Sequence, residues 1–136
     1  GLGIFKPAEY EPAMEMPDEE YPITLMTGRI LYHYNACAMT DKTEGINRIA
    51  GESFIEVNTE DAKALGIHDQ EMIAVVSRRG RIETRARVSG KTRKGDCWMP
   101  FHYLEGGANW LTNNALDKIS STPEYKVCAI RLEKLS

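Results

Sequence analysis

The stretch MIAVVSRRGRIETRARV, residues 72–88, decides the fold class of this chain. Its first six residues form an apolar run rich in β-branched side chains, which predicts a buried strand. Arg78, Arg79 and Gly80 follow as a turn, where glycine would supply a positive φ if the turn requires one. From Arg81 to Val88, apolar or small side chains alternate with charged ones, as in a strand with one buried and one solvated face. The stretch therefore predicts a β-hairpin.

Similar strand signals recur on both sides of this hairpin. Short apolar runs predict further strands at 23–26, 53–57, 97–101 and 127–132. Pro100 should mark the end of its strand or an edge of the sheet, because proline cannot donate a ladder hydrogen bond. About five to seven short strands separated by turns predict a mainly β protein with short helices, built as a barrel or a sandwich.

Helices are expected in three places. Asn58, followed by acidic residues and then by Gly66, predicts a helix of about two turns. A second helix fits residues 39–49, with Thr40 or Asp41 as its N-cap. Residues 109–116 fit either a short helix or a loop.

Length and composition suit one soluble domain. The chain has 136 residues, of which 42% are hydrophobic and 27% charged. No apolar run approaches the ~20 residues that span a bilayer, and no signal peptide is expected. Three cysteines lie far apart with no Cys-x-x-Cys pair, so a local zinc or iron–sulfur motif is not expected. A reducing, cytoplasmic setting is the simpler interpretation.

Charge divides the chain into a lead-in, residues 1–21, and a folded domain, residues 22–136. Residues 1–20 carry six acidic residues and one lysine, and three of the six prolines fall there. Such a segment is expected to wrap over a surface rather than join a core. The remaining 116 residues carry 14 acidic and 16 basic side chains, a net charge of +2. This balance weakly favours an anionic ligand and lacks the basic stripe of a nucleic-acid-binding protein.

Four short segments carry candidate binding residues. Thr27, Gly28 and Arg29 offer a hydroxyl, a backbone amide and a guanidinium, a set that can hold a phosphate. Asn109 follows two glycines and offers a donor and an acceptor to a heterocycle edge, and Lys126 offers a point charge. The fourth segment is His33-Tyr34-Asn35-Ala36. Each has a plain structural alternative: a strand-end turn, a glycine-rich surface loop, a surface lysine and a packed aromatic pair.

No catalytic or metal-binding constellation is found. The chain has no Gly-x-Ser-x-Gly, no P-loop, no Gly-x-Gly-x-x-Gly and no His-Glu-x-x-His. Its residues alone thus predict a β-rich binding domain without catalytic residues of its own.

Five blocks in order carry a resemblance to a known family. They are TGRILYHYNACAMT (27–40), VNTEDAKALGI (57–67), VVSRRGRIETRARV (75–88), MPFHYLEGGANWLTNN (99–114) and TPEYKVCAIRLEK (122–134). The segment from Tyr21 to Leu135 resembles the molybdopterin dinucleotide-binding domain that ends the catalytic subunit of molybdenum and tungsten oxidoreductases. The resemblance implies a six-stranded double-psi β-barrel, also called an aspartate-decarboxylase-like barrel. One departure is Asp69-Gln70, where the family often has Asp-Gly.

The resemblance also implies a cofactor, bis(molybdopterin guanine dinucleotide) with molybdenum or tungsten. Its contacts would come from Thr27, Gly28, Arg29, Ile30, Leu31, Tyr32, His33, Tyr34, Asn35, Ala36, Asn109 and Lys126. Phe101 would lie on the substrate side. The family's metal ligand, catalytic residues and iron–sulfur cysteines lie in other domains, so this chain would supply no catalytic residue and no metal ligand.

The resemblance is greatest to formate dehydrogenases, which implies a role in oxidising formate to carbon dioxide. Expected partners are the remaining domains of the catalytic subunit, which would hold a 4Fe–4S cluster, and an electron-transfer subunit. No nucleic acid or membrane partner is expected. The alternatives are the same domain of a nitrate reductase or related reductase, a separate cofactor-binding module, and a barrel with a purely structural or protein-interaction role.

Overall fold

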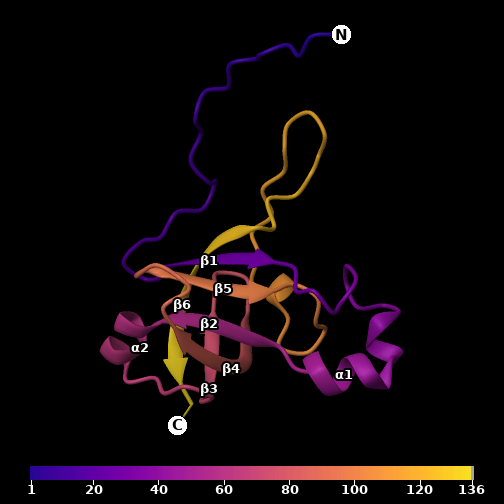
Figure 1. Cartoon of the computed structure of the whole chain (residues 1–136). Helices are drawn as coiled ribbons and strands as arrows, with labels where there is room; N and C mark the ends of the chain where they lie inside the picture. The colour runs from indigo at the N-terminus through magenta and orange to yellow at the C-terminus, as the bar shows by residue number, and fades with distance from the viewer. Residues whose placement is uncertain (136) are drawn as a thin grey trace.

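In the computed structural model, which describes residues 1–135, six stretches of the chain form strands (Figure 1). The strands are β1 (Ile23–Gly28), β2 (Phe54–Asn58), β3 (Met72–Val76), β4 (Arg81–Ser89), β5 (Asp96–Pro100) and β6 (Val127–Lys134). They match the six predicted strands to within two residues at each end. The hairpin predicted from 72–88 is confirmed as the antiparallel pair β3–β4.

The strands close into one barrel in the order β1-β5-β2-β4-β3-β6. Two of its pairs are parallel, β1 with β5 and β2 with β4, and the other four are antiparallel. Strands that are neighbours in the sequence are therefore often separated in the barrel, so the connections cross over one another. This arrangement confirms the six-stranded barrel that the resemblance implied. Pro100 lies at the end of β5, since a closed barrel has no edge strand.

The inward faces of the strands fill the barrel with apolar side chains. Leu25, Ile55, Ile73, Met99 and Ile130 are all fully buried in this core. On β4 the predicted alternation holds: Ile82, Thr84 and Ala86 are buried, and the charged residues between them are exposed or half-buried. The period-2 pattern thus decided which face of this strand enters the core.

The helices are short and lie outside the barrel, α1 (Glu44–Ala50) and α2 (Thr59–Leu65) on opposite sides (Figure 1). The boundaries predicted for α2 are confirmed: the Asn58 side chain accepts a hydrogen bond from the amide of Glu60, and Gly66 has a φ of 67°. The cap predicted for the other helix is wrong. Its N-cap is Thr43, because the Thr40 hydroxyl is bonded to His33 and Thr40 begins the separate 3-10 turn η1 (Thr40–Lys42).

The reason for glycine at position 80, in the β3–β4 turn, also differs from the prediction of a positive φ. Gly80 is not among the residues with positive φ. A Cβ at this position would instead lie 2.9 Å from the carbonyl oxygen of Trp110. Gly80 is therefore needed for close packing against the 3-10 turn η2 (Ala108–Trp110).

The lead-in approaches the barrel only over its last residues. Residues 1–12 are exposed and run away from the barrel, on the side where the loop after η2 also projects (Figure 1). From Met14 onward, hydrogen bonds join the chain to the barrel and to the loop before β6, and Tyr21 is buried. Within residues 1–135, no helix is long and apolar enough to cross a membrane.

A strained residue in the α2–β3 connection leads to the first prediction. Gln70 has a φ of 65°, and its backbone is held there by hydrogen bonds with Ala86 and Arg85. A side chain in this conformation costs roughly 1–2 kcal/mol, whereas glycine adopts it freely but loses about 0.5–1 kcal/mol of chain entropy. Gln70→Gly should raise the free energy of unfolding by up to about 1 kcal/mol in urea denaturation. Gln70→Ala keeps the strain and should show no gain; a loss of stability in Gln70→Gly would contradict this explanation.

Candidate functional site

The candidate site begins where the parallel strands β1 and β5 end together. Thr27 pairs with Met99 and Gly28 with Pro100, and the amide of Phe101 donates to the carbonyl of Gly28 at 3.2 Å. Two loops leave the barrel from this point, residues 29–39 after β1 and residues 101–107 after β5. The barrel thus places the segment of Thr27, Gly28 and Arg29 beside the start of the loop that leads to Asn109, although about 70 residues separate the two strand ends in the sequence.

Four side chains from three segments form what we call the cation–aromatic row: Arg29, Phe101, Tyr125 and Lys126. The Arg29 guanidinium lies 5.4 Å from the centre of the Phe101 ring, and Phe101 meets Tyr125 edge to face with ring centres 5.7 Å apart. The Lys126 ammonium lies 5.9 Å from the centre of the Tyr125 ring. An aromatic pair therefore has a cation at each end, an arrangement that attraction between cations and ring faces stabilises.

Neither cation of the row is neutralised by a carboxylate. Among residues 1–135, no ion pair involves Arg29 or Lys126, and both side chains are exposed. The guanidinium bonds instead to the neutral amide oxygen of Asn35, at 3.3 Å. Two uncompensated cations beside flat aromatic faces suit an anionic ligand that also carries aromatic rings.

Thr27 holds the backbone of two residues of the row, Tyr125 and Lys126. Its hydroxyl donates to the carbonyl of Tyr125 at 2.8 Å, and its amide donates to the carbonyl of Lys126 at 3.0 Å. The side chain is buried. Because a hydroxyl has one proton to donate, this proton is engaged inside the protein. Thr27 therefore positions Tyr125 and Lys126, and its predicted contact with a phosphate stays a prediction.

Gly28 is required by a neighbouring side chain. A Cβ at this position would lie 2.7 Å from Nε1 of Trp98 on β5. The indole ring fills the space that glycine leaves, so packing alone requires glycine here, and the predicted contact of the Gly28 amide with a phosphate stays a prediction.

His102 shapes the loop after β1, and the sequence analysis did not single it out. It is 1% exposed; its Nε2 accepts from the amide of Ile30 at 2.9 Å, and its Nδ1 bonds to the carbonyl of Asn35. Because an amide only donates and a carbonyl only accepts, these bonds fix the neutral ring with its proton on Nδ1. One ring thus holds the loop near its start and close to its middle. The signal in the sequence was the position of His102, directly after Phe101 in the matching block.

His33 anchors the middle of the same loop. Its ring bonds to the Thr40 hydroxyl at 2.9 Å and to the carbonyl of Ala50 at 2.6 Å, where the Tyr103 hydroxyl also donates. The structural alternative, a satisfied histidine packed among aromatic residues, describes this side chain. Other predicted members of the loop project outward and are exposed: Leu31, Tyr32, Tyr34, Asn35 and Ala36. Asn35 and Cys37 have φ values of 46° and 61°, as expected of a tightly held loop.

Asn109 lies in η2, apart from the row. Its carbonyl accepts from the Thr112 hydroxyl at 3.4 Å, and no hydrogen bond within residues 1–135 joins its side chain to the row. The segment is nevertheless tied to the strand after Lys126, because the Asn113 side chain donates to the carbonyl of Val127 at 2.9 Å. The structure therefore groups most of the predicted residues and leaves Asn109 on a neighbouring loop.

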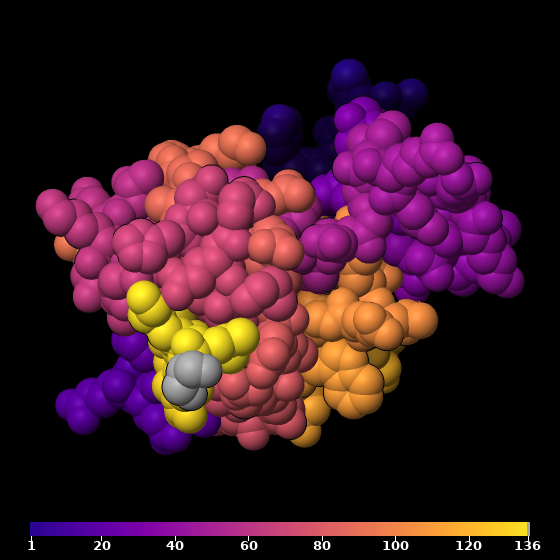
Figure 2. All heavy atoms as spheres, turned by 90° about the horizontal axis from the view of Figure 1, so that it is seen from below, coloured from indigo at the N-terminus to yellow at the C-terminus, as the bar shows by residue number. Residues whose placement is uncertain are grey.

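Two hollows of similar size lie elsewhere on the surface, and neither is lined by a residue of the row. One, of about 680 Å³, forms where segments 36–53, 83–85 and 103–106 adjoin (Figure 2, magenta, rose and orange). Four acidic and two basic residues line it, so it does not favour an anion. Thr84 also lines it, and its buried hydroxyl has no hydrogen-bond partner among residues 1–135. The other hollow, of about 640 Å³, is lined by residues that include Trp98, Lys91 and Arg93.

The three cysteines are free and buried at separate places. Burial raises the pKa of the Cys97 thiol to about 12 and that of the Cys128 thiol to about 11, so both are protonated at neutral pH. Within residues 1–135, no group of three or more His, Cys, Asp or Glu side chains lies together as a metal site would require.

Comparison with known proteins places this geometry in context. Residues 23–129 match the family described as "Molydopterin dinucleotide binding domain". The chain is 50% identical over 99% of its length to the F420-dependent formate dehydrogenase 2 subunit alpha of Methanococcus maripaludis. It is 43% identical over 96% of its length to a protein named nitrate reductase of Symbiobacterium thermophilum. It covers 20% and 18% of these two relatives, so the chain spans about one fifth of their length.

A solved structure has the same fold. Acetylene hydratase from Pelobacter acetylenicus superposes with a TM-score of 0.75 over 86% of this chain and 19% of that one. Since the two are only 15% identical, this likeness concerns the fold alone.

Proposed function

The chain belongs to the family of molybdopterin dinucleotide-binding domains, and from this premise we propose that the cation–aromatic row and the loop it anchors bind bis(molybdopterin guanine dinucleotide). The observation that carries the proposal is the pair of uncompensated cations, Arg29 and Lys126, on an aromatic base. The chain would act as one domain of a longer catalytic subunit that oxidises formate to carbon dioxide.

The residues present fit the chemistry of this cofactor. Its pyrophosphates are anionic, and Arg29 and Lys126 offer charge-assisted hydrogen bonds. Its pterin and guanine rings are flat, with donors and acceptors on their edges, which the amides of Asn109 and Asn35 can match. The outward-facing residues from Ile30 to Ala36 would line it, and Phe101, which lies between Arg29 and Tyr125, would face the substrate side.

In this proposal the cofactor supplies the redox chemistry, and this chain binds and positions the cofactor. When bound, the cofactor supplies two-electron redox chemistry at its molybdenum or tungsten. Oxidation of formate to carbon dioxide releases two electrons and one proton, and this chain carries no catalytic residue for it. Its own residues bind, orient and cover the cofactor: Arg29 and Lys126 by charge, Thr27 and His102 by holding the loops in place.

The wider setting is also a proposal. A 4Fe–4S cluster in the remaining domains and an electron-transfer subunit would carry the electrons away. Three free, buried thiols in the structure support a reducing compartment, and we propose the cytoplasm.

A second candidate function is supported by the relative named nitrate reductase, at 43% identity. The same row would then hold the same cofactor in an enzyme that reduces nitrate. Steady-state assays of the complete protein with formate and with nitrate distinguish the two. Activity with nitrate but not with formate would favour the second candidate and leave the binding role of the row unchanged.

Arg29→Ala should lower cofactor content more than it lowers stability. The change removes a charge-assisted hydrogen bond, which contributes about 1.5–3 kcal/mol, or roughly 10- to 150-fold in affinity. The side chain is exposed and lies outside the core, so the free energy of unfolding should change by less than about 1 kcal/mol, the size of one exposed cation–ring contact. Metal and pterin content of the complete purified subunit, with urea denaturation of the chain, measures both effects.

Arg48→Ala is the matched control for this prediction. Arg48 is also exposed, lies on α1 and not in the row, and within residues 1–135 its one ion pair is with Glu44. Its cofactor content should equal that of the wild type. Full cofactor content in Arg29→Ala would remove Arg29 from the site. A triple change of Arg29, Asn109 and Lys126 to alanine that also left the content unchanged would favour a purely structural barrel.

A further inference from the structure

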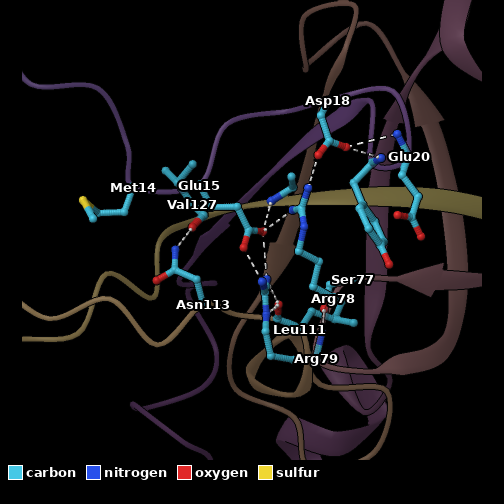
Figure 3. A network of polar contacts seen from close by, with 12 residues as sticks. Met14, Glu15, Asp18, Glu20, Ser77, Arg78, Arg79, Leu111, Asn113 and Val127 are labelled. Carbon is cyan, nitrogen blue, oxygen red and sulfur yellow. Dashed lines mark hydrogen bonds and ion pairs between the residues drawn. The ribbon is translucent and has the colours of Figure 1, made fainter.

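Glu15 of the lead-in is fixed against the barrel by four hydrogen-bond and ion-pair donors (Figure 3). Two nitrogens of Arg79 reach its carboxylate, one of them at 2.9 Å, and Arg78 lies 3.5 Å away. The amide of Ala129 donates to it at 2.7 Å. The side chain is 14% exposed, far less than an ordinary surface glutamate. Burial raises the pKa of Glu15, but the bonds from Arg79 and Ala129 outweigh burial and hold that pKa below its ordinary value.

The carboxylate occupies a seam in the barrel. β3 ends at Val76, which pairs with Arg131, whereas β6 starts four residues earlier, at Val127. From Val127 to Ile130, β6 pairs with β1 on one side and has no β3 partner on the other. Ala129 is fully buried there, so an unpaired amide would be costly. Glu15 supplies the acceptor that a neighbouring strand would otherwise provide.

Arg79 carries the contact onward to the loop of Asn109. While bonded to Glu15, its guanidinium also donates two hydrogen bonds to the carbonyl of Leu111, at 3.2 and 2.7 Å. Leu111 is fully buried and lies two residues after Asn109. The position of η2 therefore depends on a guanidinium that Glu15 orients.

A second contact, from Met14, joins the lead-in to the loop of Lys126. The amide of Met14 donates to both carboxylate oxygens of Glu124, at 3.2 and 3.3 Å. Glu124 lies two residues before Lys126 and also accepts from the Asn113 side chain at 3.0 Å. Adjacent residues of the lead-in thus reach two of the segments that carry predicted cofactor residues: Met14 contacts the Lys126 segment directly, and Glu15 reaches the Asn109 segment through Arg79.

We propose that Glu15 and Arg79 are positioning residues, which hold the Asn109 and Lys126 segments in the arrangement that binds the dinucleotide. This inference rests on the proposed function of the row. The lead-in would then hold the two supporting loops of the site in place. It would also connect this domain to other parts of a longer protein.

The test compares Glu15→Gln with Glu19→Gln in the 136-residue chain, using guanosine diphosphate as the probe. Glu19 lies in the same segment and is exposed, and it makes no ion pair within residues 1–135, so its change alters the charge equally. Two readouts are taken where each variant is fully folded: the nucleotide dissociation constant from NMR titration, and amide exchange at Leu111. Leu111 suits this purpose because its amide is bonded to Ala108 at 2.9 Å.

Glu15→Gln should weaken nucleotide binding roughly three- to tenfold and speed exchange at Leu111 by a similar factor. Glu19→Gln should change neither. Arg79→Lys should behave like Glu15→Gln, since an ammonium cannot bridge Glu15 and the Leu111 carbonyl as a guanidinium does. Arg81→Lys, on the exposed face of β4, is its control. A purely structural role would alter stability but leave the affinity of the folded protein unchanged.

Two results overturn the proposal, and they differ in what else they overturn. If the wild type binds the nucleotide and Glu15→Gln binds it equally well, the positioning role fails and the proposed function stands. If the wild type gives no nucleotide-induced shifts at all, the proposed function fails and the positioning role falls with it, whatever happens to exchange at Leu111.

Discussion

Gly107→Ala is expected to destabilise the chain by about 3 kcal/mol, the upper end of the usual range for overpacking. Gly107 is buried directly before η2, and a Cβ there would overlap the carbonyl oxygen of Tyr103 and lie 3.1 Å from its carbonyl carbon. The obstacle is backbone, so no side-chain rotation relieves it, and forced overpacking costs about 1–3 kcal/mol or more. Tyr103 would have to move, and with it the hydroxyl that bonds to the carbonyl of Ala50 beside His33.

Urea denaturation of Gly107→Ala beside Gly45→Ala measures this effect. Gly45 lies in α1, and nothing surrounds its missing Cβ within 4 Å. Alanine favours helix over glycine by about 0.5–1 kcal/mol, so Gly45→Ala should stabilise. If the free energy of unfolding falls in Gly107→Ala and rises in Gly45→Ala, the effect of steric overlap is separated from that of helix propensity. Wild-type stability in Gly107→Ala would mean that the 103–107 loop packs differently from the structure described.

Leu25→Ala should lower the free energy of unfolding by about 2–5 kcal/mol, the usual range for a leucine removed from a packed core. Leu25 is fully buried in the barrel interior, on the strand that pairs with both β5 and β6. Its loss leaves a cavity that three paired strands cannot readily fill. Since β1 ends at the loop of Arg29, the same change tests how far the site depends on a rigid barrel.

Ile119→Ala is the control for this substitution. Ile119 is 97% exposed, so its truncation should change the free energy of unfolding by less than about 0.5 kcal/mol. Both variants are compared by urea denaturation, with one common value for the dependence of the free energy of unfolding on urea concentration. A loss below about 1 kcal/mol in Leu25→Ala would contradict the assignment of Leu25 to the core.

The sequence predicted the elements well where local signals decide structure. The hairpin of residues 72–88 follows from alternation and a turn, and the helix after Asn58 follows from its cap and Gly66. These signals act over a few residues, so they can be recognised in the sequence without knowledge of the fold. They do not show which strands pair: β1 and β5, parallel neighbours, lie about 70 residues apart, and the barrel order came from the family resemblance.

The features that the sequence could not predict depend on distant partners. The loop after β1 takes its shape from His102, 72 residues after Ile30, and the helix cap moved to Thr43 because His33 engages Thr40. Glu15 bonds to residues 64 and 114 positions away, so an acidic lead-in could be predicted to wrap over a surface but not to enter a seam. Side-chain polarity alone carries no information about such pairings.

The candidate site shows the same limit. Arg29 and Lys126 were proposed as anion ligands from residue type, and the structure brings them to the two ends of one aromatic pair. Thr27 and Gly28 are predicted as ligands too; their contacts with Tyr125 and Trp98 show a structural role that residue type did not reveal, and their contact with a cofactor stays a prediction. A residue's type suggests which ligand it suits, and only its neighbours show whether it is available.

The central claim is that the cation–aromatic row and its loop bind the dinucleotide, and NMR titration of the chain with guanosine diphosphate tests it most directly. We expect chemical-shift changes at residues 27–36, Phe101 and Lys126, with saturation in the millimolar range, because one nucleotide is a small part of the cofactor. Changes centred on Lys91 and Trp98, or none at tens of millimolar nucleotide, would contradict the claim.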